Sequence, residues 1–176
     1  MSTIIDGSAS VTINSGAILG ITSGTAVAST SGTSIDFTSI PSWVKRITVM
    51  FSGVSLNSTG LYLIQIGSGS VATTGYDSNY IVGNNGSTNT VAASSSGYII
   101  FTGTATFTLN GSMIITNLTS NTWVQQGIFS NSVTTPYITS TAGTKALSGV
   151  LDRIRITSTT GTDTFDAGAI NILYEG

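Results

Sequence analysis

Apolar and polar residues alternate along most of this chain, in short stretches separated by Gly, Asn and Ser. In the clearest stretch, residues 44–54, the side chains of Ile47, Val49 and Phe51 fall on one face of an extended backbone. Polar side chains occupy the other face, with Met50 as the exception. This period of two predicts half-buried β-strands, and no stretch shows a convincing helical period. We therefore expect an all-β fold.

Further strands are predicted where β-branched and aromatic residues stand between turn-forming residues. Residues 61–66 are apolar on both faces, as in a central strand covered on both sides. Ile154 and Ile156 alternate with Arg153 and Arg155, which indicates a half-exposed strand. Eight or more short antiparallel strands in 176 residues are typical of a jelly-roll β-sandwich. The other predicted strands are residues 34–40, 97–102, 105–109, 112–118, 123–129, 133–138 and 169–174.

Turn-forming residues indicate where the strands are connected. Asn110 and Gly111 predict a two-residue hairpin between strands 105–109 and 112–118, because both central positions of a type I′ turn need positive φ. Residues 82–96 consist mainly of Asn, Ser and Gly, which predicts a long loop. Long loops on a rigid sandwich often carry function, so this loop is a candidate contact surface.

The first 33 residues differ from the rest. Their aliphatic residues are separated by Gly and Ser, and the tetrad Thr-Ser-Gly-Thr occurs at 22–25 and again at 30–33. Such a segment cannot bury its own apolar side chains, so we expect an extended N-terminal arm, residues 1–33, docked against a neighbouring subunit or another protein. The jelly-roll domain then comprises residues 34–176. The residues expected to make the docking contacts are Ile4, Ile5, Val11, Ile13, Ile18, Leu19 and Ile21.

The side chains that carry most enzymatic chemistry are scarce. His and Cys are absent, and only 7% of the residues are charged. Imidazole, thiolate and clustered carboxylates supply most acid–base, nucleophilic and metal-binding chemistry at neutral pH. We therefore expect a non-enzymatic protein without catalytic residues, cofactor or bound metal.

Two aspartates are candidate ligands for a metal ion. Asp163 and Asp166 stand beside a Gly-rich turn and could offer carboxylate oxygens to Ca²⁺. The favoured interpretation is that they cap backbone amides or pair with Arg153 and Arg155. A glycosidase needs two carboxylates flanking a sugar, and no motif brings any two of the aspartates together.

Charge bears on the partners of the chain. Five Lys and Arg residues and a net charge of −2 provide no basic surface for binding nucleic acid. A surface of uncharged Ser and Thr is what remains when much of it is buried against copies of itself, which favours a symmetric homo-oligomer.

The N-terminal residues do not predict a membrane segment. They lack a positive n-region, and the apolar run 17–21 is too short for a signal peptide or a membrane span. We therefore expect synthesis in a cytoplasm and no membrane insertion.

Aromatic side chains suggest a glycan contact. Tyr76 and Tyr80 stand in a polar stretch that leads into the predicted loop, where we expect them to be exposed. An exposed aromatic ring can stack on the apolar face of a pyranose. Together with Asn84 and Asn85, these tyrosines are the candidate residues for contact with a glycan.

Several segments carry a family resemblance. The chain reads SIDFTSIPSWVKRITVMF at 34–51, IQIG at 64–67 and TGY at 74–76. Within residues 149–175 it reads LDRIRI at 151–156 and GTDTFDAG at 161–168. Together these segments resemble a module of tailed-bacteriophage structural proteins, especially tail-fibre and related virion-surface proteins. The resemblance covers most of the chain from Ser34 onward and does not extend to the arm.

The resemblance implies a virion protein that is made in the host cytoplasm and displayed on the particle surface. By similarity to other phage surface proteins it implies a trimer, attached to capsid or tail proteins through the arm. One form of this function is a short tail fibre or adhesin that contacts a host-surface glycan through many weak contacts. The alternative is a capsid decoration protein that stabilises the head. A free carbohydrate-binding module is a third class, less favoured because no signal peptide is recognisable.

Overall fold

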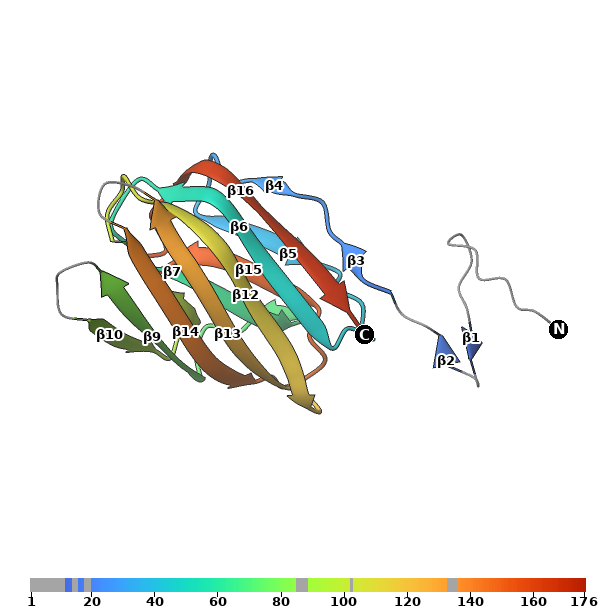
Figure 1. Ribbon diagram of the computed structural model, residues 1–176. Helices are drawn as coiled ribbons and strands as arrows, with labels where there is room; N and C mark the ends of the chain where they lie inside the picture. Colours follow the sequence, from blue (N-terminus) through green and yellow to red (C-terminus); the bar gives the residue numbers. More distant parts are fainter. Residues whose placement is uncertain (1–11, 14–15, 18–19, 85–88, 102, 133–135) are drawn as a thin grey trace.

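The computed structural model describes residues 12–13, 16–17, 20–84, 89–101, 103–132 and 136–176. Two antiparallel sheets pack face to face as a sandwich, and a separate two-stranded pair lies near the N-terminus (Figure 1). The described part holds no helix, and so none that could span a membrane. The expected all-β class is confirmed.

The larger sheet has nine strands, and all its pairings are antiparallel. Strands β12, β13 and β14 are consecutive in the chain and adjacent in the sheet, which makes them a meander. In spatial order the strands are β10 (Thr90–Ser94), β9 (Tyr76–Asn84), β14 (Tyr137–Ala146), β13 (Thr122–Ser132), β12 (Thr108–Thr119), β6 (Arg46–Leu56), β16 (Phe165–Glu175) and β3 (Thr22–Ser23), with β4 (Val27–Ala28) also paired to β16.

The smaller sheet has five strands and covers the other side of the core (Figure 1). Its order is β11 (Tyr98–Ile100), β7 (Tyr62–Ser68), β15 (Arg153–Ser158) and β5 (Ser34–Thr38), with β8 (Ser70–Val71) paired to β7. The chain passes between the sheets at β4 to β5, β5 to β6, β6 to β7, β8 to β9, β10 to β11, β11 to β12, β14 to β15 and β15 to β16. Segments far apart in the sequence therefore become neighbours, as when β15 pairs with β5.

The main core lies between the two sheets. Ile47, Val49 and Phe51 of β6 are all buried, as their alternation predicted. Phe51 packs edge to face on Phe129 of β13, with ring centroids 5.5 Å apart. From the smaller sheet, Ile154 and its neighbours complete the same cluster, while Arg153 and Arg155 stay partly exposed. The half-exposed strand at 153–156 is thus confirmed.

A second, smaller core explains why β7 is buried on both faces. Leu63 of β7 and Ile99 of β11 are buried against Tyr80 and Val82 of β9. These residues form a cluster separate from the main core, because β9 and β10 continue past the edge of the smaller sheet and cover it. The prediction of a central strand at 61–66, covered on both sides, is confirmed.

The hairpin predicted at Asn110 and Gly111 is wrong. Both residues lie inside β12, where the pairing with β6 shifts register between Leu109 and Gly111. The Asn110 side chain accepts a hydrogen bond from the Gly53 amide at 2.8 Å, and a Cβ on Gly111 would overlap the Ile128 carbonyl oxygen. These residues therefore serve a β-bulge, which also uses positive φ at glycine.

The strand expected at 105–109 is likewise wrong in its first half. The Phe107 amide donates to the Thr104 carbonyl oxygen at 3.0 Å, which closes a turn before β12 begins. The actual hairpin joins β12 to β13, with Thr119 opposite Thr122.

The long loop expected at 82–96 is also wrong over much of its length. Strand β9 continues to Asn84, and residues 90–94 form β10, the edge strand of the larger sheet. The sequence gives little period-two signal in β10, because its residues are Thr, Val, Ala, Ala and Ser, with Val91 as the one large aliphatic side chain. Of the strand predicted at 133–138, residues 133–135 lie outside the described residues, and the strand that follows, β14, is Tyr137–Ala146, half of it Thr, Ser and Gly.

Part of the predicted arm lies on the chain's own sheet. β3 and β4 pair with β16, and the Gly24 amide donates to the Ile172 carbonyl oxygen at 2.8 Å. The Ser29 hydroxyl is buried and donates to the Ala167 carbonyl oxygen at 2.7 Å. Residues 22–29 therefore cover the β16 edge of their own sandwich. Ile21, just before them, is 68% exposed.

Of the other predicted docking residues, Ile13 belongs to β1 (Thr12–Ile13), which pairs only with β2 (Gly16–Ala17) among the strands described. The remaining ones, Ile4, Ile5, Val11, Ile18 and Leu19, lie outside the described residues.

Candidate functional site

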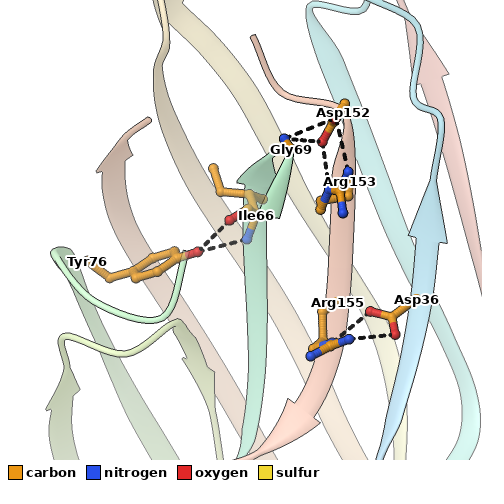
Figure 2. A network of polar contacts seen from close by, with 7 residues as sticks. All are labelled: Asp36, Ile66, Gly69, Tyr76, Asp152, Arg153 and Arg155. Atoms are coloured by element: carbon orange, nitrogen blue, oxygen red, sulfur yellow. Dashed lines mark hydrogen bonds and ion pairs between the residues drawn. The ribbon is translucent and has the colours of Figure 1, made fainter. Parts of the chain in front are cut away.

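Tyr76 is buried, so the expectation that it would be exposed is wrong. It opens β9 with its ring directed into the main core, 5.1 Å from the Tyr98 ring. Its hydroxyl accepts from the Ile66 amide at 2.7 Å and lies within donating distance of the Ile66 carbonyl oxygen (Figure 2). Burial raises the pKa of this hydroxyl, chiefly by desolvation. Tyr76 is thus a core residue and cannot stack on a sugar.

Tyr80 is also buried, and its predicted exposure is wrong for the same reason. Every second residue of β9 faces inward, and Tyr80 is one of them. Its ring lies in the second core, with its centroid 5.7 Å from that of the Phe101 ring. Burial raises the pKa of its hydroxyl as well. The backbone of Asn84 ends β9, whereas its side chain and all of Asn85 lie outside the described residues. The predicted aromatic platform for a glycan is therefore not present at these tyrosines.

Polar side chains with planar groups line up on the outer face of the smaller sheet. The strand register places Arg155 of β15 between Asp36 of β5 and Gln65 of β7. Arg155 donates from Nε to Asp36 Oδ1 at 2.7 Å and from Nη2 to Asp36 Oδ2 at 2.9 Å (Figure 2). Gln65 is buried and donates from Nε2 to the Ser96 carbonyl oxygen at 2.8 Å. We call these three residues the planar polar row.

A groove lies beside this row and is lined by two of its members, Arg155 and Gln65. It has a volume of about 400 Å³, and hydroxyl groups of Ser and Thr form most of its rim. The turn at 158–161 is held by its own hydrogen bonds, among them Gly161 amide to Ser158 Oγ at 3.2 Å. The residues that line the groove, here called the polar groove, are Thr33, Ser34, Leu63, Gln65, Thr73, Ser96, Arg155, Thr157, Ser158, Thr159, Thr160 and Gly161.

Sequence reasoning missed the polar groove because its residues come from separate parts of the chain. One part of the groove could have been found from the sequence, because Arg155 and the neighbouring Asp36 both lie on the polar faces of predicted strands. Of the two roles expected for Asp163 and Asp166, pairing with the arginines of β15 is wrong. Arg155 pairs with Asp36 and Arg153 with Asp152, whereas Asp166 accepts a hydrogen bond from the Ser55 hydroxyl.

The second arginine pair lies on the same strand, outside the polar groove. Arg153 donates from Nε to Asp152 Oδ1 at 2.8 Å, and the Gly69 amide lies 3.1 Å from each Asp152 oxygen (Figure 2). The hydrogen bond from Arg153 lowers the pKa of the Asp152 carboxyl, and the Gly69 amide lowers it further. Asp152 thereby links the loop after β7 to the start of β15.

The Asp152→Asn variant is expected to lose less of its unfolding free energy on acidification than the wild type does. A carboxyl whose pKa is lowered on folding stabilises the fold fully above its unfolded pKa, about 4 for aspartate, and loses that contribution as the pH falls through its folded pKa. The measurement is urea unfolding at neutral pH and below pH ~3. The difference in unfolding free energy between the two should be smaller in Asp152→Asn, and also in Arg153→Met. An unchanged difference in both variants would contradict the assigned role of the pair.

The outer face of the larger sheet has a different character. Register aligns Met50, Ser112, Ile128, Ser140 and Ile81 in one row across β6, β12, β13, β14 and β9. The next row contains Thr48, Ile114, Gln126, Ala142 and Asn79, so neither row contains a charge. We call these two rows the uncharged face.

Aliphatic side chains stand out from this face. Ile128 is 66% exposed, Val91 of the neighbouring edge strand 68%, and Ile81 43%. A shallow hollow of about 450 Å³ lies beside Ile128, between β12 and β14. The ion pair of Arg46 with Glu175 lies in a further row at the ends of β6 and β16. An apolar patch of this kind on a neutral surface is typical of a protein contact.

Comparison of the chain with protein-family models, with curated proteins and with solved structures found no match.

Proposed function

We propose that this chain is a non-enzymatic structural protein of a tailed-phage virion, displayed on the particle surface as a short tail-fibre or adhesin-type protein. The assignment to a tailed phage is supported by the sequence resemblance of residues 34–51, 64–67, 74–76 and 149–175. The protein is made in the host cytoplasm and becomes part of the virion. We further propose that the sandwich is of the jelly-roll type, which is supported by the repeated passage of the chain between its two antiparallel sheets.

The observation that carries the proposal is the uncharged face. Around the three-fold axis of a trimer the same residues of all three subunits come together, and an uncharged face avoids like-charge repulsion there. Exposed Ile128 and Ile81 add apolar area that association would bury. The proposed assembly is a homotrimer, and the segment before Gly20 provides the attachment to capsid or tail proteins.

Four of the carboxylates support a structural role. Asp36, Asp152 and Glu175 are each engaged by an arginine, and Asp166 by the Ser55 hydroxyl. A catalytic acid or base has to face a substrate with its proton-transferring oxygen free to react. These four carboxylates instead join neighbouring strands or loops of the sandwich.

Immunogold electron microscopy of intact phage particles, with an antibody raised against residues 34–176, tests the proposal. Label at the tail is the expected result and would support an adhesin. Label over the head would overturn the tail assignment in favour of the capsid decoration alternative. A third outcome is that the particles carry no label and immunoblots of the phage stock detect the chain only as free protein. That outcome would overturn the virion assignment and favour the free carbohydrate-binding module.

A further inference from the structure

We propose that the polar groove on the smaller sheet binds a neutral saccharide, with Arg155 and Gln65, which line it, contacting its hydroxyl groups. This inference rests on the proposed attachment function, to which it adds the class of ligand and the residues that contact it. It relocates the predicted glycan contact from Tyr76 and Tyr80, which are buried, to the polar groove on the outer face of the smaller sheet.

The chemistry of the row selects a neutral polyol. Arg155 uses Nε and Nη2 for Asp36, so the positive charge is already compensated, and the guanidinium has N–H groups beyond those two. A sugar hydroxyl in the groove can accept a hydrogen bond from these N–H groups and leave the ion pair intact. An anionic ligand at the same place would be repelled by the Asp36 carboxylate, and a cationic one by the Arg155 guanidinium.

The groove is built before any ligand arrives. Gln65 is held by the Ser96 carbonyl oxygen, and the Thr157 hydroxyl donates to the Thr33 carbonyl oxygen at 2.9 Å. Leu63 beneath them is buried in the second core. Side chains that are already fixed lose little entropy on binding, so a preformed groove favours affinity.

The groove also suits repeated weak attachment. At about 400 Å³ it is large enough for one or two sugar rings, and its rim is open to solvent. A single open site of this kind gives weak binding, but several copies in one assembly raise the overall affinity through effective concentration. This matches a chain displayed in several copies toward a glycan-covered surface.

The test is NMR titration of the isotopically labelled full chain with maltotriose, lactose, mannobiose and diacetylchitobiose. At least one sugar is expected to shift the backbone amides of Ser96, Arg155 and Thr157 together. Arg155→Met should weaken that binding by about 10-fold or more, because a charged hydrogen-bond donor is lost. Arg153→Met is the matched control: it lies on the same strand and the same face, outside the groove, and should bind normally.

A second variant keeps the test decisive if Arg155→Met does not fold. Thr73→Trp adds a bulky ring at an exposed position of the groove rim, and it should block binding with a native-like amide spectrum. The inference is overturned if none of the four sugars shifts these amides, if Arg153→Met weakens binding as much as Arg155→Met, or if sodium sulfate at constant ionic strength displaces the sugar, which would indicate an anion site. A virion label with no sugar binding would leave the proposed function standing and this inference refuted.

Discussion

Alanine at position 168 is expected to lower the free energy of unfolding by about 2–6 kcal/mol, from about 1–3 kcal/mol of backbone strain and about 1–3 kcal/mol of overpacking. Gly168 has φ +89°, a conformation that side chains disfavour. A Cβ there would overlap the Gly53 carbonyl oxygen. Because that atom belongs to the backbone of β6, the overlap cannot be relieved by a side-chain rotation. Such a loss approaches the whole stability of a small domain, about 5–15 kcal/mol.

The position of Gly168 explains why the chain needs glycine there. The pairing of β16 with β6 shifts register between Ala167 and Ala169, so Gly168 lies in a bulge opposite Gly53, which also has positive φ. Bulges of this kind bend and twist a strand. The bulge lies close to Asp166, whose carboxylate engages Ser55 across the same two strands.

Gly161 provides the matched control for this variant. Its φ is +71°, but no atom lies within 4 Å of the position a Cβ would take. Gly161→Ala should therefore cost only the backbone strain, about 1–2 kcal/mol. Urea unfolding followed by circular dichroism gives both values. Equal losses in the two variants would show that the close approach to Gly53 contributes nothing.

Glutamate at position 128 is expected to break the proposed homotrimer while leaving the sandwich folded. Ile128 is 66% exposed at the centre of the uncharged face, so a charged side chain costs little in the separate subunit. In an assembly that covers this face, the carboxylate would be buried without a partner, which costs about 3–5 kcal/mol. The dissociation constant should rise on the order of 100-fold or more.

The measurement is the molar mass of the purified chain by light scattering during size-exclusion chromatography, over a range of concentrations. Val150→Glu is the matched control, because Val150 is 54% exposed and belongs to the connection between β14 and β15 rather than to the uncharged face. Wild type and Val150→Glu should keep the mass of a trimer, and Ile128→Glu should lose it. A trimer that persists in Ile128→Glu would place the oligomer contact elsewhere, and a monomeric wild type would refute the homotrimer.

Part of the candidate site could be predicted from the sequence. The alternation of Ile154 and Ile156 with Arg153 and Arg155 identified a strand with a polar outer face, and that face carries the polar groove. The partners of the arginines could not be predicted, since Asp36 precedes Arg155 by 119 residues and meets it only through the pairing of β5 with β15. The tyrosines were misplaced because polar neighbours in the sequence do not report which face of a strand is covered.

The sequence by itself determined the all-β class and the inward face of its most regular strands, because a period of two is a local property that needs only alternating side chains. It also indicated residues such as Ile47 and Ile154 as core. Only the tertiary structure decided that Asn110 and Gly111 form a bulge, that Tyr80 is buried in a second core, and that Gln65, Arg155 and Asp36 form one row. The physical reason is that bulges, burial and rows depend on strand order and register, which are set by contacts between residues far apart in the chain.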